Sequence, residues 1–454
     1  MPLEKRARFV LLLTGLSASA ADAGRAPSRS IVFTHSTVID ATSRPPRSDM
    51  AVVITDGRIV AIDRTGRVKV PRGAEVVPAD GAFLIPGLWN MHVHAGSYDD
   101  AKSALPSLVA NGITGLRDMG APLEDVLRLR KETTDGTLLG PRMVVAGPLL
   151  QGPLPFKMPL LLSVSNQPEA RQAVAMLKGR GVDFVKIQDT LPRELYRAIA
   201  EEAKRRHLPF AGHIPPSVRA IETADAGQAS IEHLGGQFLG VLLGCSRREA
   251  ALHQEQMANL EGIRQVLAQG RSPAKLHLRA AFVRAVLESY DDDTAARLLA
   301  RFAQRQIWQC PTLVTLKTLW PDNKDGLREE DLEYGEKVYA KDLEVVRAMH
   351  RAGVRFLAGT DGPLANAARV HDELAALVEA GLTPLEALQT ATRGPATFLG
   401  SLDSFGTIEE GKVADLVLLE ANPLEDIRNT RKVIAVVIRG RFLPKVSLHE
   451  MLAR

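Results

Sequence analysis

The central part of the chain alternates short apolar runs with longer segments whose apolar residues recur every three or four positions. Such runs predict buried strands, and the spacing of three or four predicts amphipathic helices, for example over 192–207 and 370–381. The candidate strands lie at 83–94, 112–118, 141–147, 182–187, 208–214, 229–234, 307–313 and 354–361. This alternation over residues 83–404 predicts an α/β fold, a (β/α)8 TIM barrel, with a doubly wound open sheet as the alternative.

The two ends of the chain have a different pattern. Short β-type runs follow one another between residues 30 and 82 and return between 405 and 446. Asp56-Gly57 lies between two of these runs, which is a common β-hairpin signal. Because each end alone is short of core, the pattern predicts one small composite β-sandwich formed by both ends. Two independent β appendages are the alternative.

The first residues predict a secretory signal peptide over 1–22. Lys5, Arg6 and Arg8 precede an apolar run, and Ala18-Ser19-Ala20 fits a cleavage site; an ordinary first helix is the alternative. No other segment has the roughly 20 consecutive apolar residues of a membrane helix. The pattern therefore predicts a secreted or periplasmic protein that has no membrane contact after signal cleavage.

Charge and cysteine content add little to this picture. The formal net charge is +4 and the basic residues are scattered, so the sequence has no nucleic-acid-binding stripe. Cys245 and Cys310 could pair in an oxidising compartment, and their spacing leaves this open.

Candidate metal ligands occur at the ends of the predicted strands. His92 and His94 end the first strand, and side chains two apart in a strand face the same way, so both imidazoles can bind one ion. A packed pair of histidines is the alternative for this motif alone. Further candidates at later strand ends are Lys186, His213, His233 and Asp361. A buried lysine is readily neutral, and a neutral amine reacts with carbon dioxide to give a carbamate that can bridge two cations.

The ordered set of ligands resembles the amidohydrolase superfamily, and within it the imidazolonepropionase-like and prolidase-like binuclear metal-dependent hydrolases. The likeness includes Pro86-Gly87-Leu88 before the two histidines, the Gly-Thr-Asp that ends at Asp361, and the segments 380–388 and 406–416. It implies a TIM barrel with a composite β-sandwich, and two divalent metal ions, with zinc as the metal. By this resemblance, the first metal is bound by His92, His94 and Asp361, the second by His213 and His233, and carboxylated Lys186 bridges them.

The resemblance also implies an activity, which is hydrolysis of an amide (C–N) bond by a hydroxide held between the two metals. Asp361 would take the proton of the nucleophile and deliver it to the leaving amine. The expected substrate is a small amide such as a dipeptide or an N-acyl amino acid. The alternatives are a cyclic amide, an ester or a lactone as substrate, a mononuclear deaminase, and a non-catalytic binding protein. The resemblance leaves a homo-oligomer open.

Substrate contacts are harder to assign. Arg117 ends a predicted strand, and Tyr98 and His371 follow predicted strands, so all three are candidates. The neighbouring Ser97 and Asp118 are candidates too, and a structural role is the alternative for each. Two connections, 235–306 and 317–353, are much longer than the others and contain helical patterns. Long connections on a barrel usually carry helices that cover the site, so we expect these two to decide substrate specificity.

Overall fold

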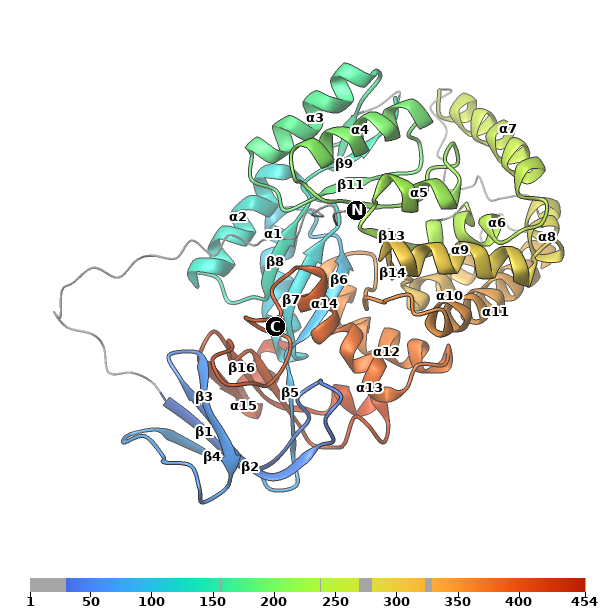
Figure 1. Cartoon of the computed structure of the whole chain (residues 1–454). Coiled ribbons are helices and arrows are strands. Elements are labelled where there is room, and N and C mark those ends of the chain that lie inside the picture. The colour runs from blue at the N-terminus through green and yellow to red at the C-terminus, as the bar shows by residue number, and fades with distance from the viewer. Residues whose placement is uncertain (1–29, 155–156, 237, 269–279, 323–328, 454) are drawn as a thin grey trace, which may run out of the picture.

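The computed structural model describes residues 30–154, 157–236, 238–268, 280–322 and 329–453 (Figure 1). The predicted signal peptide at 1–22 lies outside these residues. Within the described part of the chain, no helix combines the length and the apolar character that crossing a bilayer requires. Cys245 and Cys310 are both buried free thiols.

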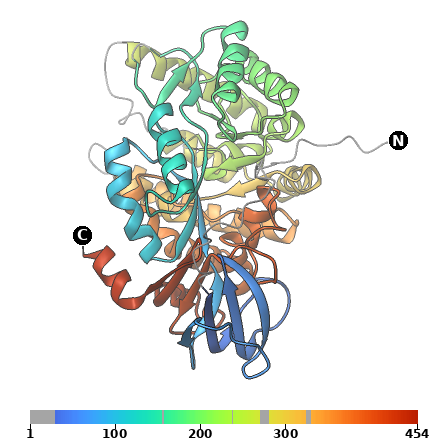
Figure 2. The same ribbon diagram turned by 90° about the vertical axis from the view of Figure 1, so that its left-hand side faces the viewer.

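The two ends of the chain contribute strands to one sheet, where the sequence pattern predicted a composite β-sandwich. Its strands are ordered β17-β16-β15-β5-β1-β2-β3, with β4 paired to β1. Figures 1 and 2 show the blue N-terminal strands beside the red C-terminal ones. One apolar cluster joins both ends, with Phe33 and Ile54 packed together with Leu416 and Val437. The bounds are β1 Ser30–Val38, β2 Arg47–Thr55, β3 Arg58–Arg64, β4 Glu75–Pro78, β5 Phe83–Pro86, β15 Leu416–Leu419, β16 Val433–Ile438 and β17 Arg441–Pro444.

The strand expected over 83–94 is in fact two strands in two sheets. β5 pairs antiparallel with β15 in the terminal sheet, whereas β6, Leu88–Val93, pairs parallel with β7. Gly87 separates them, and its N–H donates to the carbonyl of Asp415. The continuous apolar run concealed this break because both strands are buried, so neither shows the alternation of a half-exposed strand.

The central strands are parallel and form two groups, β6-β7-β8 and β10-β9-β11-β12-β13-β14. On one side a backbone hydrogen bond connects the groups directly, from Asp183 N–H to the Val145 carbonyl (2.9 Å). On the other side the segment 354–361 connects them, since Leu357 N–H donates to the Gln309 carbonyl and Met91 N–H donates to the Ala358 carbonyl (both 2.8 Å). This arrangement is TIM-barrel-like. The bounds are β7 Ile113–Asp118, β8 Arg142–Val145, β9 Leu149–Gln151, β10 Leu161–Ser163, β11 Val185–Ile187, β12 Phe210–Gly212, β13 Ser230–Glu232 and β14 Trp308–Cys310.

The last expected strand, 354–361, is not a regular strand. It makes an isolated parallel bridge between Phe356 and Gln309 and then turns its hydrogen bonds toward β6, where Thr360 N–H donates to the His92 carbonyl. The backbone hydrogen bonds of this segment go partly to β14 and partly to β6, so neither side has a continuous ladder. The segment still occupies the position between β14 and β6.

Helices surround these strands (Figure 1). Their apolar faces are buried as the spacing predicted; in α4, for example, Leu195, Ile199 and Ala203 are all buried. The bounds are α1 Tyr98–Ala110, α2 Leu123–Asp135, α3 Gln167–Gly179, α4 Arg193–Arg205, α5 Ala220–Ala226, α6 Gly240–Gly244, α7 Glu249–Ala268, α8 Ala280–Glu288, α9 Asp292–Arg305, α10 Leu313–Asp322, α11 Glu329–Arg351, α12 Val370–Glu379, α13 Pro384–Thr390, α14 Arg393–Phe398 and α15 Lys445–Leu452. Short 3-10 helices lie at His233–Gly235, Leu364–Arg369 and Ile427–Arg431.

Candidate metal centre

Four histidine rings lie in a chain of contacts at the carboxyl ends of the central strands. The His92 ring lies 5.5 Å from that of His94 and 4.4 Å from that of His233, between ring centres. The His233 ring in turn lies 5.0 Å from that of His213. The structure thus brings together imidazoles from β6 and from the ends of β12 and β13, as expected for side chains at the same end of parallel strands.

Asp361 lies among three of these rings. One carboxylate oxygen is 3.2 Å from His94 Nε2 and 3.5 Å from His92 Nε2, and the other is 3.6 Å from His233 Nε2. Burial would raise the pKa of this carboxyl, but the three histidines outweigh it and hold the pKa well below its usual range. Its backbone has a φ of +53°, a strained conformation for a non-glycine residue. The backbone N–H donates to the His92 carbonyl, which holds Asp361 in this position.

Each of the four imidazole rings is also oriented by a second contact, at Nδ1. The Nδ1 atom pairs with a protein acceptor in every case: His92 with Glu232 (2.8 Å), His94 with the Gly120 carbonyl (2.9 Å), His213 with Asp189 (2.9 Å), and His233 with the Thr312 hydroxyl. A partner at Nδ1 fixes the ring orientation and leaves the lone pair of Nε2 to bind a metal ion. This pattern is typical of metal-binding histidines.

Lys186 lies on β11 with only 1% of its surface exposed. Its Nζ and the Nε2 of His92 are buried atoms without a hydrogen-bond partner in the described structure. Burial lowers the pKa of Lys186 to about 8, although the charges of Glu232 and Asp361 oppose this. A buried polar atom without a partner is costly, so both atoms fit a ligand role. A cation at His92 Nε2 and a carbamate on Lys186 would satisfy them.

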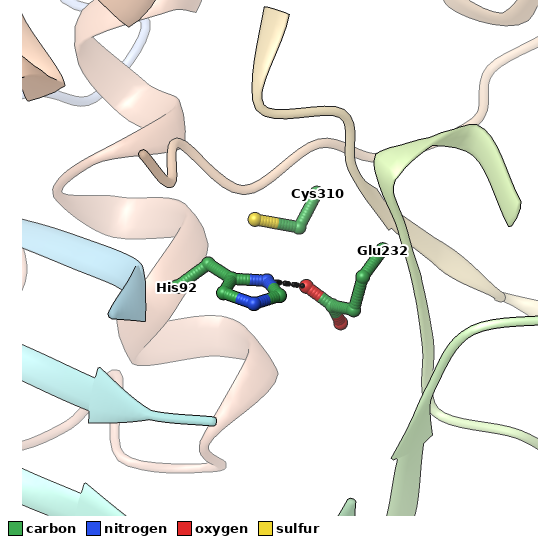
Figure 3. Close-up of side chains that lie close together, drawn as sticks. All are labelled: His92, Glu232 and Cys310. Atoms are coloured by element: carbon green, nitrogen blue, oxygen red, sulfur yellow. Dashed lines mark hydrogen bonds and ion pairs between the residues drawn. The ribbon is translucent and has the colours of Figure 1, made fainter. Parts of the chain in front are cut away.

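Two groups of side chains have donor atoms close enough to share an ion: His92, His94 and Asp361 in one, and His92, Glu232 and Cys310 in the other. Figure 3 shows the second group, with the hydrogen bond between His92 and Glu232. Burial holds the pKa of Cys310 well above its usual range, so its thiol is neutral and a poor ligand. Glu232 is already engaged by Arg117. The first group is therefore the better metal site.

Arg117, which the sequence offered as a substrate contact, lies inside the fold, and its contact with substrate stays a prediction. Its side chain is fully buried and one guanidinium nitrogen donates to both oxygens of Glu232, at 3.0 and 2.9 Å. Burial would raise the pKa of Glu232, but Arg117 and His92 outweigh it and hold the pKa well below its usual range. Arg117 is thus linked to the His92 ring through one carboxylate.

The other two predicted substrate contacts, Tyr98 and His371, also have partners within the protein, and their contact with substrate stays a prediction. The Tyr98 hydroxyl donates to Glu132 on α2, on the outer layer of helices. His371 is 1% exposed, and its two ring nitrogens bond the Thr430 hydroxyl and the Asn111 carbonyl. Both side chains have structural partners that the sequence pattern could not reveal, because these partners come from other elements.

The neighbouring candidates have local roles as well. Ser97 caps α1 by accepting from Asp100 N–H. Asp118 is buried and accepts from the backbone N–H groups of Ala95 and Gly120, next to His94. Burial raises the pKa of Asp118 to about 6.

Several functional neighbours were not singled out from the sequence, namely Glu232, Asp189, Thr312 and Gly120. For Glu232 a signal existed. Ser230 and Glu232 are two apart on the short buried strand β13 and share a face, where their side chains form a hydrogen bond. Two polar residues with this spacing in a buried strand indicate a polar network inside the fold.

Comparison with known proteins finds relatives that align with most of the chain. The chain is 24% identical over 411 residues to the ochratoxinase of Aspergillus niger. This alignment covers 76% of this chain and 72% of the relative. It is 26% identical over 364 residues to an imidazolonepropionase of Mesorhizobium japonicum, covering 76% of this chain and 80% of the relative.

Solved structures resemble it over nearly the whole chain. A putative prolidase from Bifidobacterium longum has 26% identity and a TM-score of 0.71, covering 94% of this chain and 98% of the other. A Xaa-Pro dipeptidase with bound methionine has the same fold, with 20% identity, a TM-score of 0.69, and coverage of 91% and 100%. The sequence profile of the Amidohydrolase family matches residues 83–443. The protein is therefore an enzyme of the amidohydrolase family.

Proposed function

We propose that the protein is a binuclear metal-dependent hydrolase that cleaves the C–N bond of a small amide such as a dipeptide or an N-acyl amino acid. The observation that carries this proposal is the set of imidazoles whose Nδ1 atoms are occupied, next to the unpartnered Nζ of Lys186. Family relatives that hydrolyse amides, ochratoxinase and prolidase, support the substrate class.

The residues divide into two sets of ligands. His92, His94 and Asp361 would hold one ion, and His213 and His233 the other, with a carbamate on Lys186 between them. Nitrogen and carboxylate donors without thiolate fit zinc. The two cations would supply Lewis acidity and lower the pKa of a water molecule in the site.

The chain's own contribution to proton transfer comes from Asp361. The low pKa keeps this carboxylate ionised, so it can accept a proton from the attacking water. Its backbone is fixed by the bond to the His92 carbonyl, which holds the carboxylate among the ligands during the transfer. The same oxygen can then deliver the proton to the leaving amine.

Two variants test the proposal. Asp361→Asn keeps the size of the side chain but removes its basicity, so we expect turnover of dipeptides and N-acyl amino acids to fall at least 100-fold, in the range of a lost acid–base group. Lys186→Ala is expected to lower the metal content, which elemental analysis measures, below about two ions per chain. Unchanged turnover in the first variant, or unchanged metal content in the second, contradicts the proposal.

A panel of amides and matched esters decides between the proposed amide substrate and the alternative of an ester, lactone or cyclic amide. Faster turnover of amides, relative to their uncatalysed hydrolysis, supports the proposal. Export from the cell is also proposed, on the basis of the N-terminal pattern over residues 1–22. Finding the intact N-terminus in the cytoplasmic fraction would contradict export.

A further inference from the structure

One turn of the chain contacts both halves of the candidate metal centre. It runs from Thr312 to Thr315, where α10 begins. The Thr312 hydroxyl is hydrogen-bonded to Nδ1 of His233, a proposed ligand of the second ion. The Thr315 hydroxyl donates to the carbonyl of Thr360, the residue before Asp361. A shift of this turn would therefore disturb a proposed ligand of each ion.

The backbone of this turn has a conformation that needs support. Thr312 has a φ of +50°, which is rare for a β-branched residue. Its carbonyl accepts from the backbone N–H groups of Thr315 (2.9 Å) and Leu316 (3.0 Å), which closes the turn. The first N–H groups of a helix have no acceptor within the helix, and a strained residue persists only where surrounding groups hold it. The start of α10 thus needs an acceptor from another element.

Glu373 on α12 supplies this acceptor. α12 packs against α10 (Figure 1), and Glu373 is fully buried there. Its Oε2 accepts from Val314 N–H at 2.8 Å, whereas Oε1 is a buried atom without a hydrogen-bond partner among the described residues. An apolar side chain would be buried at this position with less loss of hydration. The contribution of the carboxyl is therefore the bond to the turn.

We propose that Glu373 is a positioning residue of the metal centre, which holds the start of α10 so that the Thr312 hydroxyl stays on His233. The same hold keeps the Thr315 hydroxyl on Thr360. The inference rests on the metal ligands assigned in the proposed function. Glu373 acts through the turn, because its hydrogen bond goes to Val314 and not to a ligand.

The Thr312 hydroxyl decides how His233 is presented to an ion. When Nε2 binds a metal, Nδ1 carries the proton and donates to the hydroxyl oxygen. This bond fixes the direction of the ring, and loss of such a partner usually lowers metal affinity by about 10- to 100-fold. Because Glu373 acts on this bond indirectly, we expect an effect at the lower end of that range.

Zinc affinity of the metal-free protein, measured by competition with a chelator in the presence of bicarbonate, tests the proposal. Glu373→Leu keeps most of the side-chain volume but removes the acceptor, so affinity for the ion at His213 and His233 is expected to fall about 10-fold. Glu379→Leu, on the exposed side of the same helix, is the matched control and should bind zinc like the wild type.

A conservative variant separates the acceptor from the charge. Burial raises the pKa of Glu373 to about 8, although the backbone N–H groups of α10 oppose this, so the carboxyl is largely uncharged at pH 7. Glu373→Gln is also uncharged and keeps an oxygen for Val314 N–H, so we expect it to retain wild-type zinc affinity. Affinity as low as that of Glu373→Leu would overturn the proposal.

Variants of Thr312 test the route to the metal centre. Thr312→Val removes the hydroxyl and is expected to weaken zinc binding at least as much as Glu373→Leu, whereas Thr312→Ser should retain it. The double variant Glu373→Leu with Thr312→Val should bind no more weakly than Thr312→Val alone, because both changes act on one hydrogen bond. Losses that add in the double variant would overturn the proposal.

Two further outcomes would also decide against it. Wild-type zinc affinity in a folded Glu373→Leu protein, even with a lower free energy of unfolding in urea, would leave Glu373 a structural role only. Wild-type affinity in Thr312→Val would refute the route even if Glu373→Leu does not fold.

The binding measurement is independent of catalysis. If the wild type hydrolyses no amide but these losses of affinity are seen, the proposed function fails and the role of Glu373 stands. If amides are hydrolysed while Glu373→Leu binds zinc like the wild type, only the role of Glu373 fails.

Discussion

Glu232→Gln is a sharp test of how the metal centre is held. Glu232 accepts from Arg117, from His92 Nδ1 at 2.8 Å and from the Ser230 hydroxyl, and neither it nor Arg117 has exposed surface. Glutamine has nearly the same shape but has one NH2 group in place of a carboxylate oxygen. In either orientation the NH2 group of the glutamine faces the N–H donors of Arg117 or His92, so two donors meet with no acceptor between them.

The expected cost follows from these contacts. Removing one partner of a buried ion pair typically costs about 3–5 kcal/mol, because the other charge stays buried without compensation. The change also removes the acceptor that fixes the His92 ring, and loss of such a partner usually lowers metal affinity by about 10- to 100-fold. We therefore expect a large loss of stability and, separately, weaker metal binding.

Urea denaturation of the metal-free protein measures the first effect, and competition with a chelator measures the second. Arg117→Met combined with Glu232→Gln is the control, because removing both charges should cost less than the sum of the single changes. A stability loss below about 1 kcal/mol together with unchanged metal affinity would refute the reasoning, since an exposed pair would give that result.

Three further outcomes are expected. His371 is buried, and burial lowers its pKa to about 4. Between pH 6.5 and 4 the unfolded chain therefore binds one more proton than the folded chain. The free energy of unfolding should fall by about 3 kcal/mol as the pH drops through this window. In His371→Gln, urea denaturation at pH 7 and pH 5 should show a smaller difference than in the wild type. Gly359→Ala is expected to lower stability and metal content, because a Cβ there would lie 2.5 Å from the Cys310 sulfur and 2.7 Å from the His92 Cβ; normal metal content would contradict this. After a chelator has removed the metal, zinc with bicarbonate is expected to restore the activity of the wild type but not that of Lys186→Arg, because arginine keeps its charge and forms no carbamate. Equal recovery of activity in both proteins would exclude the carbamate.

The local pattern of the chain was sufficient to predict the alternating strands and helices and the sheet shared by both ends. It was also sufficient to find candidate ligands, since each follows an apolar run that marks a strand end, and the carboxyl ends of parallel strands meet at one end of a barrel. His92 and His94 needed only their spacing of two. The break at Gly87 was missed because both flanking strands are buried.

Partners distant in the chain could not be predicted in this way. Arg117 and Glu232 are 115 positions apart, and His371 and Asn111 are 260 apart, so only the closure of the fold decides that they meet. The sequence by itself thus determined which residue types stand at the strand ends. Tertiary structure alone decided which buried charges are paired, because pairing depends on distance in space and on desolvation.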